Sequence, residues 1–267
     1  MAQDILKYFA RNHADFLHAH GSKSTALLIE KIDCQPGESI LEIGFGTGAT
    51  LVELAHRFGE TNFCGLEQSE FMFETAQKRI KACKFVNQIS LYLIEGRSAP
   101  FVENQFDTIY LESILAIQNE SNLRQLLKNI QIWLKPGGKF ICNETVWLPH
   151  VPLSRIKDIN DKCLQQFGII QASGDFPYQM HWVELFESYE LKVIEAHAIV
   201  NENALTPIKQ KKESRRFTQT GKIRSMLNLK LRREFRTYQR AMNEIIPAGD
   251  QLMEGWLFQM RNEKKSH

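Results

Sequence analysis

A short apolar segment that runs directly into three alternating glycines constrains the fold of this chain most. Residues 40–43 are strand-like, Gly44, Gly46 and Gly48 follow, and a helical apolar period begins at Leu51. Glycine tolerates positive φ and has no Cβ, so such a turn can approach a ligand closely. The helix behind it offers unpaired N–H groups to polar or anionic ligand atoms. The segment predicts a strand, a tight turn and a helix in an open α/β sheet.

The glycines alone leave two classes of nucleotide-like ligand open. Gly44-x-Gly46-x-x-Ala49 satisfies the dinucleotide-binding pattern. Glu67 follows Gly48 by 19 residues, at the end of an apolar run, where a carboxylate can accept hydrogen bonds from two ribose hydroxyls of either cofactor class. An NAD-dependent oxidoreductase is therefore one interpretation. A plain strand–helix turn with a surface glutamate is another.

Three further motifs separate these interpretations. Glu42 stands two places before the first glycine, residues 106–111 read as a fourth strand, and the run Leu-Lys-Pro-Gly-Gly-Lys-Phe over 134–140 closes a helix and opens a fifth strand. In this order the motifs resemble those of the class I S-adenosylmethionine-dependent methyltransferases, and the resemblance covers about residues 37–145. Within that family, the chain is most similar to the branch that methylates quinones, sterols and natural products. The resemblance implies in-line methyl transfer to a small organic acceptor of apolar or mixed polarity. It disfavours the oxidoreductase, for which no hydride-transfer constellation is visible.

The alternation of elements predicts an α/β protein with a mostly parallel sheet and helices on both faces. Strands are expected near 38–43, 62–67, 89–94, 106–112, 138–145, 190–200 and 253–260, and core helices near 48–59, 69–83, 120–134 and 182–188. The resemblance implies a Rossmann-like seven-stranded sheet in the order 3-2-1-4-5-7-6, whose last two strands form an antiparallel pair.

We expect a single methyltransferase domain over 1–267, because a chain of this length can bury one sizeable core. Its predicted parts are an N-terminal helical cap (1–35), a cofactor-binding core (36–145), a helical lid insertion (146–180) and a basic helical insertion (203–249) before the last strand. Both insertions lie where the resembling family places elements that cover the substrate.

The cofactor implied by the resemblance is S-adenosylmethionine, with S-adenosylhomocysteine as its product. The family's motifs assign the glycine turn to the amino-acid end of the cofactor, Glu67 to the ribose and Gln68 to the adenine. A segment after the third strand meets the adenine edge; relatives often carry Gly-Asp-Ala there, and this chain carries Gly-Arg-Ser, so Ser98 or backbone groups must replace the acidic contact. The candidate cofactor-binding residues are Gly44, Phe45, Gly46, Gly48, Glu67, Gln68, Gly96, Arg97 and Ser98.

The candidate catalytic residues are Glu112 and His150. Glu112 ends the fourth strand, and we hypothesise that it orients the acceptor or stabilises positive charge near the sulfonium. The alternative is a carboxylate that caps the following helix. His150 follows the fifth strand and could serve as a base, which is needed only when the acceptor must lose a proton. A loop histidine is more often a surface residue, and the same holds for His181.

Residues 209–240 carry twelve Lys or Arg and two Glu, a net charge of +10 in a chain whose total is +2. Apolar residues recur at helical spacing from Ile223 through Leu227 and Leu231 to Met242, which predicts one amphipathic basic helix. Four interpretations stay open: a solvated face of a lid helix, a cover for an acidic substrate, peripheral contact with anionic lipid, and RNA-directed methylation. Nucleic acid is disfavoured, because no RNA-binding module or aromatic stacking motif is visible.

Five scattered cysteines without a C-x-x-C motif indicate buried thiols in a reducing compartment, and their spacing predicts no metal site. No apolar leader and no stretch long enough for a membrane span is visible. We therefore expect a cytoplasmic protein, as a monomer or a homodimer.

Overall fold

The computed structural model describes residues 9–16, 21–94, 99–199 and 206–264. Seven strands form one sheet in the order β3-β2-β1-β4-β5-β7-β6, in which β7 pairs antiparallel with β5 and β6 and the other neighbours are parallel. The predicted fold class and strand order are confirmed. The strands are β1 (Ser39–Ile43), β2 (Asn62–Glu67), β3 (Ile89–Leu93), β4 (Phe106–Glu112), β5 (Leu134–Trp147), β6 (Leu191–Ala198) and β7 (Met253–Asn262).

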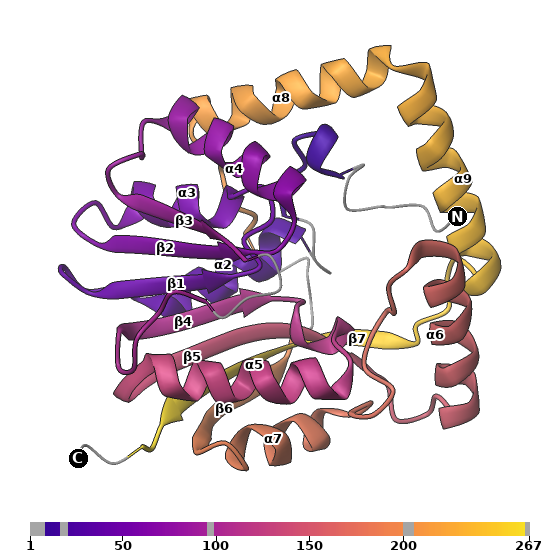
Figure 1. The fold of residues 1–267 in the computed structure, drawn as a ribbon. Helices are drawn as coiled ribbons and strands as arrows, with labels where there is room; N and C mark the ends of the chain where they lie inside the picture. The colour runs from indigo at the N-terminus through magenta and orange to yellow at the C-terminus, as the bar shows by residue number, and fades with distance from the viewer. Residues whose placement is uncertain (1–8, 17–20, 95–98, 200–205, 265–267) are drawn as a thin grey trace.

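Helices cover both faces of the sheet (Figure 1). One apolar cluster joins α2, α3 and α4 to the sheet, and a second joins α5 and α7 to its other face. Ser69 caps α4 and Asn119 caps α5 through side-chain oxygens that accept backbone N–H groups, which places both helix starts close to the predicted positions. The helices are α2 (Gly21–Ile32), α3 (Ala49–Arg57), α4 (Glu70–Cys83), the 3₁₀ turn η1 (Leu115–Ile117), α5 (Glu120–Trp133), α6 (Leu153–Phe167), α7 (Gln179–Glu187), α8 (Lys212–Leu227) and α9 (Leu229–Ile245).

The central strands are apolar on both faces, as expected for parallel strands covered by helices. Ile109, Tyr110 and Leu111 of β4 are fully buried, and so are Ile40 and Leu41 of β1. This packing holds the carboxyl ends of β1, β2 and β4 side by side, which is the edge where the glycine turn begins.

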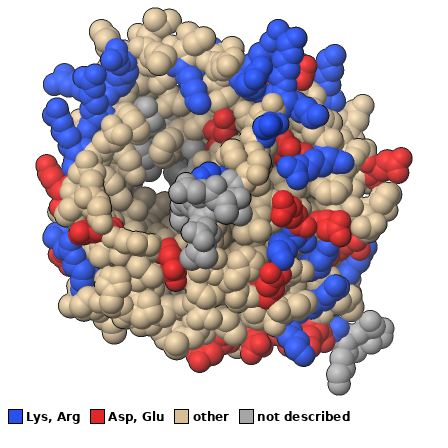
Figure 2. Space-filling model, turned by 180° about the vertical axis from the view of Figure 1, so that it is seen from behind, with Lys and Arg blue, Asp and Glu red and all other residues tan. Residues whose placement is uncertain are grey.

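Helices α8 and α9 bridge the carboxyl edge of the sheet (Figure 1). Helix α8 packs on α4, and α9 packs on α6. From behind, blue side chains gather at the upper left over the α8–α9 corner, and the surface is hollowed next to this region (Figure 2). Within the described ranges, no helix is both long and apolar enough to cross a membrane.

The prediction of one continuous amphipathic helix over the basic segment is wrong. Asn228 ends α8 in an extended conformation, and its side-chain oxygen then accepts the N–H of Leu231 to cap α9. The apolar period therefore does not share one face: Leu231 is buried, whereas Ile223 and Leu227 are exposed. The two helices meet at a corner instead of forming one rod.

The inward face of α8 consists of small residues, namely Ser214, Thr218, Gly221 and Ser225. A Cβ on Gly221 would lie 2.4 Å from the backbone oxygen of Asn12 and 2.4 Å from Cβ of His13. Helix α8 thus lies directly against the cap segment (residues 9–16), at a distance that only a small side chain allows. The predicted division of the chain into cap, core and insertions stays a prediction.

Candidate functional site

The glycine turn joins β1 to α3 at the carboxyl edge of the sheet. Gly44, Gly46 and Gly48 have φ of 73°, 53° and 75°, a region that other residues rarely adopt. A Cβ on Gly44 would lie 2.4 Å from Cδ1 of Ile114, and one on Gly48 would lie 3.0 Å from Cβ of Ala76. Conformation and close packing therefore both require glycine at these two positions.

Glu67, at the end of β2, lies against this turn. One carboxylate oxygen accepts the N–H of Gly46 at 2.9 Å, and the other accepts the N–H groups of Gln68 and Ser69 at 2.9 and 3.0 Å. Burial raises the pKa of Glu67, and these three hydrogen bonds oppose the shift. A carboxylate has about four acceptor positions, so three backbone donors fix its orientation and leave acceptor capacity for a ligand hydroxyl.

Among the described residues, three side chains donate hydrogen bonds to Glu112 at the end of β4. The hydroxyls of Thr25 and Thr50 donate to it at 2.8 and 2.9 Å, and the amide of Asn143 donates at 2.9 Å. Its carboxylate is therefore oriented by α2, α3 and β5 together. The amide oxygen of Asn143 is buried and has no hydrogen-bond partner among the described residues, which leaves one acceptor available beside Glu112 for a polar ligand group.

The alternative role of Glu112 as a helix cap does not describe this arrangement. The carboxylate that accepts the free N–H groups at the start of η1 is that of Glu144 on β5, which accepts those of Ile114, Leu115 and Ala116 at 3.0, 2.9 and 3.1 Å. These three hydrogen bonds fix the segment after β4, including Ile114, whose side chain lies against Gly44.

A second buried carboxylate lies behind Glu112. Glu42 of β1 accepts the hydroxyl of Tyr110 at 2.7 Å, and both side chains are fully enclosed by the sheet and its helices. Burial, followed by the charge of Glu112, raises the pKa of Glu42 well above its usual range. The site thus pairs an oriented carboxylate at its surface with a carboxyl group that favours its neutral form.

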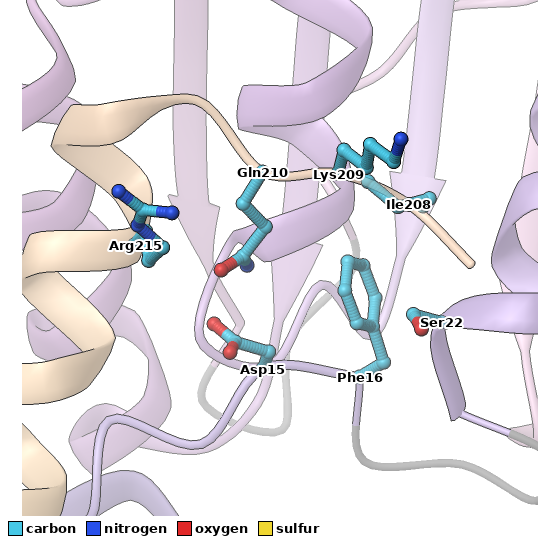
Figure 3. Close-up of a pocket in the computed structure, with 7 residues that line it drawn as sticks. All are labelled: Asp15, Phe16, Ser22, Ile208, Lys209, Gln210 and Arg215. Atoms are coloured by element: carbon cyan, nitrogen blue, oxygen red, sulfur yellow. The ribbon is translucent and has the colours of Figure 1, made fainter.

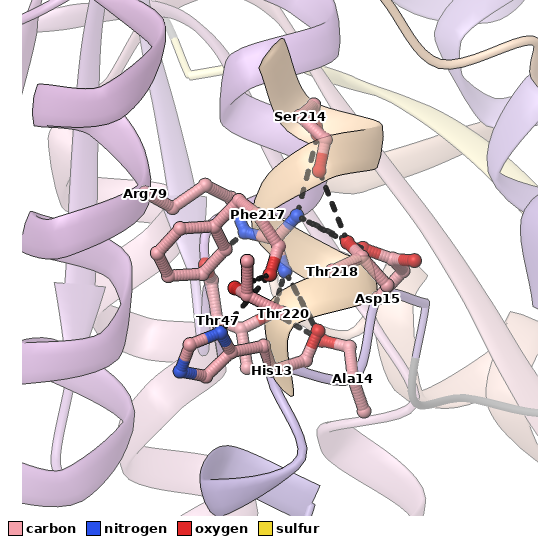
Figure 4. A network of polar contacts seen from close by, with 9 residues as sticks. All are labelled: His13, Ala14, Asp15, Thr47, Arg79, Ser214, Phe217, Thr218 and Thr220. Carbon is pink, nitrogen blue, oxygen red and sulfur yellow. Dashed lines mark hydrogen bonds and ion pairs between the residues drawn. The ribbon is translucent and has the colours of Figure 1, made fainter. Parts of the chain in front are cut away.

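Arg79 of α4 joins the glycine turn to the elements that cover it (Figure 4). The side chain is fully buried and forms an ion pair with Asp15 at 2.9 Å. It also donates to the backbone oxygen of Thr47 at 2.9 Å and to that of His13 at 3.1 Å. Its remaining partners are Ala14, Ser214, Thr218, the Thr47 hydroxyl and the ring of Phe217.

A pocket of about 420 Å³ lies between the cap segment, the start of α2 and the segment before α8 (Figure 3). Its charged lining residues are Asp15, Lys209 and Arg215, and its apolar ones are Phe16 and Ile208. Figure 3 shows the guanidinium of Arg215 on the same side of the pocket as the Gln210 amide and the Asp15 carboxylate. This lining suits a ligand that carries an acidic group.

Not every predicted residue lies at this site. His150 is exposed in the turn after β5. Asn143 pairs with Glu112, and Trp147 is four residues further along β5, so the strand carries the chain about 13 Å away before His150 is reached. His181 accepts the N–H of Tyr178 in a capping box at the start of α7. Gly96, Arg97 and Ser98 lie outside the described residues.

Sequence reasoning missed Arg79, Asn143 and Glu144. Arg79 stands in a helix with an ordinary amphipathic pattern, and its ion-pair partner is 64 residues away. Asn143 and Glu144 are polar residues that follow the buried apolar run of β5 over 140–142, and such an interruption is the one local signal that could draw attention to them. No group of three or more metal-ligating side chains occurs in the part of the chain that the structure describes.

Comparison with known proteins agrees with this architecture. A family model described as a methyltransferase domain matches residues 40–138. The demethylmenaquinone methyltransferase of Symbiobacterium thermophilum is 34% identical over 111 residues, which cover 41% of this chain and 43% of that protein. The chain spans between 29% and 43% of the length of the first curated relatives that it matches. Residues 40–138 therefore match a methyltransferase domain, and the relatives are methyltransferases named for small-molecule substrates.

Solved structures share the fold over almost the whole chain. Phosphoethanolamine N-methyltransferase 2 of Haemonchus contortus has a TM-score of 0.69 at 16% identity and covers 98% of this chain and 58% of that one. The [4+2]-cyclase SpnF has a TM-score of 0.66 at 13% identity, over 91% and 81% of the two chains. At these identities the likeness shows the fold, and the presence of a cyclase means that the fold alone does not decide the reaction.

Proposed function

We propose that this chain transfers the methyl group of S-adenosylmethionine to a small organic acceptor. The observation that carries the proposal is the position of Glu67 against the glycine turn. Its carboxylate accepts the N–H of Gly46 in the turn and those of Gln68 and Ser69, and it keeps acceptor capacity for a ligand beside the open backbone of the turn. Relatives named as methyltransferases and neighbours solved with S-adenosylmethionine or its product support the same cofactor.

The cofactor would be held by two sets of residues. We assign its amino-acid end to the turn of Gly44, Phe45, Gly46 and Gly48, and its ribose to Glu67. Gln68 would meet the adenine, together with the segment of Gly96, Arg97 and Ser98. When bound, the cofactor supplies an activated methyl group on a sulfonium, so the chain contributes positioning and the exclusion of water.

Glu112 is the residue that we propose to face the acceptor. Thr25, Thr50 and Asn143 hold the carboxylate in one orientation. The amide oxygen of Asn143, which has no hydrogen-bond partner in the part of the chain that the structure describes, adds a second acceptor atom beside it. Together they can accept hydrogen bonds from a donor on the acceptor molecule, or stabilise positive charge near the sulfonium. We assign His150 no part in this arrangement, because it is exposed beyond the end of β5.

Calorimetric titration tests the cofactor assignment. We expect S-adenosylmethionine and S-adenosylhomocysteine to bind, NAD(H) not to bind, and Glu67→Gln to weaken both adenosyl ligands at least tenfold, by about 1.4 kcal/mol or more. Glu53→Gln is the matched control, because Glu53 is a similarly buried glutamate that faces Arg57 on α3. Binding of NAD(H) alone would overturn the proposal in favour of the oxidoreductase.

Glu112→Gln tests the role of the carboxylate separately. The amide keeps the shape, so we expect cofactor affinity to change less than threefold while single-turnover methyl transfer slows by about 10²-fold or more. Normal turnover in this variant would remove Glu112 from the mechanism and leave the cofactor assignment standing.

The pocket beside the cap suggests the chemical class of the acceptor. Lys209 and Arg215 are the cations of the basic segment that line it, and we propose that they meet an acidic group of the substrate. Arg215→Gln should then raise KM for acidic acceptors about tenfold and leave neutral acceptors unchanged. Arg216→Gln, an exposed neighbour on α8 outside the pocket lining, is the control. Monomeric or dimeric state and cytoplasmic localisation remain predictions.

A further inference from the structure

The corner between α8 and α9 exposes a compact apolar tip. Ile223, Met226, Leu227 and Leu229 are 57%, 70%, 79% and 77% exposed. Two of these residues end α8, and Leu229 begins α9 directly after Asn228. Large apolar side chains gathered at one projecting point, instead of scattered singly over the surface, indicate a site of contact.

The tip projects because neither helix has a buried residue between the last buried residue of α8 and the first buried residue of α9. Ser225 is the last buried residue of α8, and Leu231 is the first of α9. Between them every residue from 226 to 230 is exposed. The bend at Asn228 therefore carries the apolar side chains away from the core, where a continuous helix would have turned Leu227 and Leu231 to the same side.

Cations surround the tip. Lys222, Arg224, Lys230, Arg232 and Arg233 are all exposed, and residues 222–233, which we call the corner segment, contain no acidic residue. Within the described ranges, none of these five cations forms an ion pair. Figure 2 shows this region as a dense group of blue side chains.

We propose that the corner segment docks on an anionic lipid surface, with its apolar tip inserted between the headgroups. Apolar side chains that enter the headgroup boundary and Lys or Arg that meet anionic lipids are the two components of peripheral membrane binding. A second copy of the chain would bring like charges together. A nucleic acid would satisfy the cations and leave the aliphatic tip in water, because bases stack on aromatic side chains.

The position of the corner gives such docking a use. Helices α8 and α9 border the carboxyl edge of the sheet, where the glycine turn and Glu112 lie (Figure 1). A surface-bound chain would thus hold its carboxyl edge near the lipid phase. The proposal concerns attachment and does not depend on which acceptor is methylated.

Vesicle co-sedimentation tests this proposal. The wild-type chain should bind vesicles that contain phosphatidylglycerol, bind phosphatidylcholine vesicles at least about tenfold more weakly, and dissociate as salt increases. The triple variant Met226→Ser, Leu227→Ser, Leu229→Ser should lose at least about tenfold in partition to the anionic vesicles. Val102→Ser removes an apolar side chain of 68% exposure elsewhere and should bind like the wild type.

Because the tip makes no buried contact, the triple variant should keep its circular dichroism spectrum and its affinity for S-adenosylhomocysteine. Equal binding of wild type and triple variant would overturn insertion of the tip, and absence of binding to anionic vesicles would overturn the proposal. A wild-type dimer that the triple variant loses would assign the tip to a second copy instead. If S-adenosylhomocysteine fails to bind while vesicle binding follows the prediction, the proposed reaction falls and the docking surface stands.

Discussion

The sheet and the elements that cover its carboxyl edge are held together by different forces. Between the sheet and its helices, large side chains such as Phe140 of β5 and Phe186 of α7 are fully buried and meet edge to face, with ring centroids 5.9 Å apart. In the cover, which comprises the cap segment and α8, small residues and the stacked rings of His13 and Phe217 surround the buried guanidinium of Arg79. Opening a large apolar core exposes many side chains to water together, so the core resists local opening. An interface that depends on one buried charged group can open locally when that group loses its partners.

Because the two regions are held by different forces, the glycine turn can stay rigid while the cover opens. The glycine turn is fixed from the sheet side by Ile114 and Glu67. The cover contacts the same turn through Thr47, whose hydroxyl donates to the backbone oxygen of Ala14 at 2.5 Å. We therefore expect the cover to open while the turn keeps its shape.

The largest effect should follow from a cavity in the sheet. Phe140→Ala removes a fully buried ring from the centre of β5 and should lower the free energy of unfolding by about 3–5 kcal/mol. Denaturant unfolding followed by tryptophan fluorescence measures it. Phe71→Ala, in which the lost ring is 42% exposed, should cost about 1 kcal/mol or less. Equal losses in the two variants would mean that the sheet does not carry the stability of the domain.

Arg79→Met should act mainly on the cover. The substitution keeps much of the volume and leaves Asp15 and several backbone oxygens without their donor, at a cost of about 3 kcal/mol or more in the cover. Limited proteolysis should then cut residues 206–230 at least tenfold faster. Lys78→Met, beside it in α4 but 65% exposed, should behave like the wild type.

Tryptophan fluorescence separates the two regions in this experiment. Trp133, Trp147, Trp182 and Trp256 all belong to the sheet and its own helices and loops. The tryptophan transition of Arg79→Met should therefore shift less than that of Phe140→Ala. A larger shift for Arg79→Met would show that cover and sheet unfold as one unit.

The smallest effect is a pH dependence of the cover. His13 stacks on Phe217 with ring centroids 4.3 Å apart, and burial lowers its pKa below 6.5; the backbone oxygen of Phe217 opposes the shift, and Arg224, Arg79 and Lys78 add to it. His13 therefore takes up a proton more readily when the cover is open than when it is closed. The closed state is fully stable above pH 6.5 and loses stability as the pH falls below that value.

Proteolysis of residues 206–230 as a function of pH measures this dependence. Cleavage should accelerate modestly below about pH 6.5, and His13→Gln should flatten that part of the profile. An unchanged profile in the variant would assign the pH dependence to another group.

Local patterns were enough to predict most of the sheet. The fourth strand is expected near 106–112 and spans Phe106–Glu112, and the strand order follows from the motifs that carry the family resemblance. Alternation and capping residues depend on near neighbours in the chain, so the sequence displays them directly. The same holds for the glycine turn, where backbone conformation and close packing both require glycine at Gly44 and Gly48.

The cover could not be predicted in this way. The apolar spacing from Ile223 to Met242 continues across Asn228 as if one helix were present, and only the cap geometry shows that the helix ends there. Arg79 gains its role from partners that are 64 and 139 residues away. Such contacts arise from tertiary packing, which no local spacing records.

Native-state hydrogen exchange of the unmodified chain tests the separation of cover and sheet most directly. We expect amides of α8 to exchange through local opening, with lower protection than those of β1, β4 and β5. We also expect S-adenosylhomocysteine to slow the exchange of α8 in particular. Exchange of α8 and the central strands at one common protection, equally affected by the ligand, would contradict this separation.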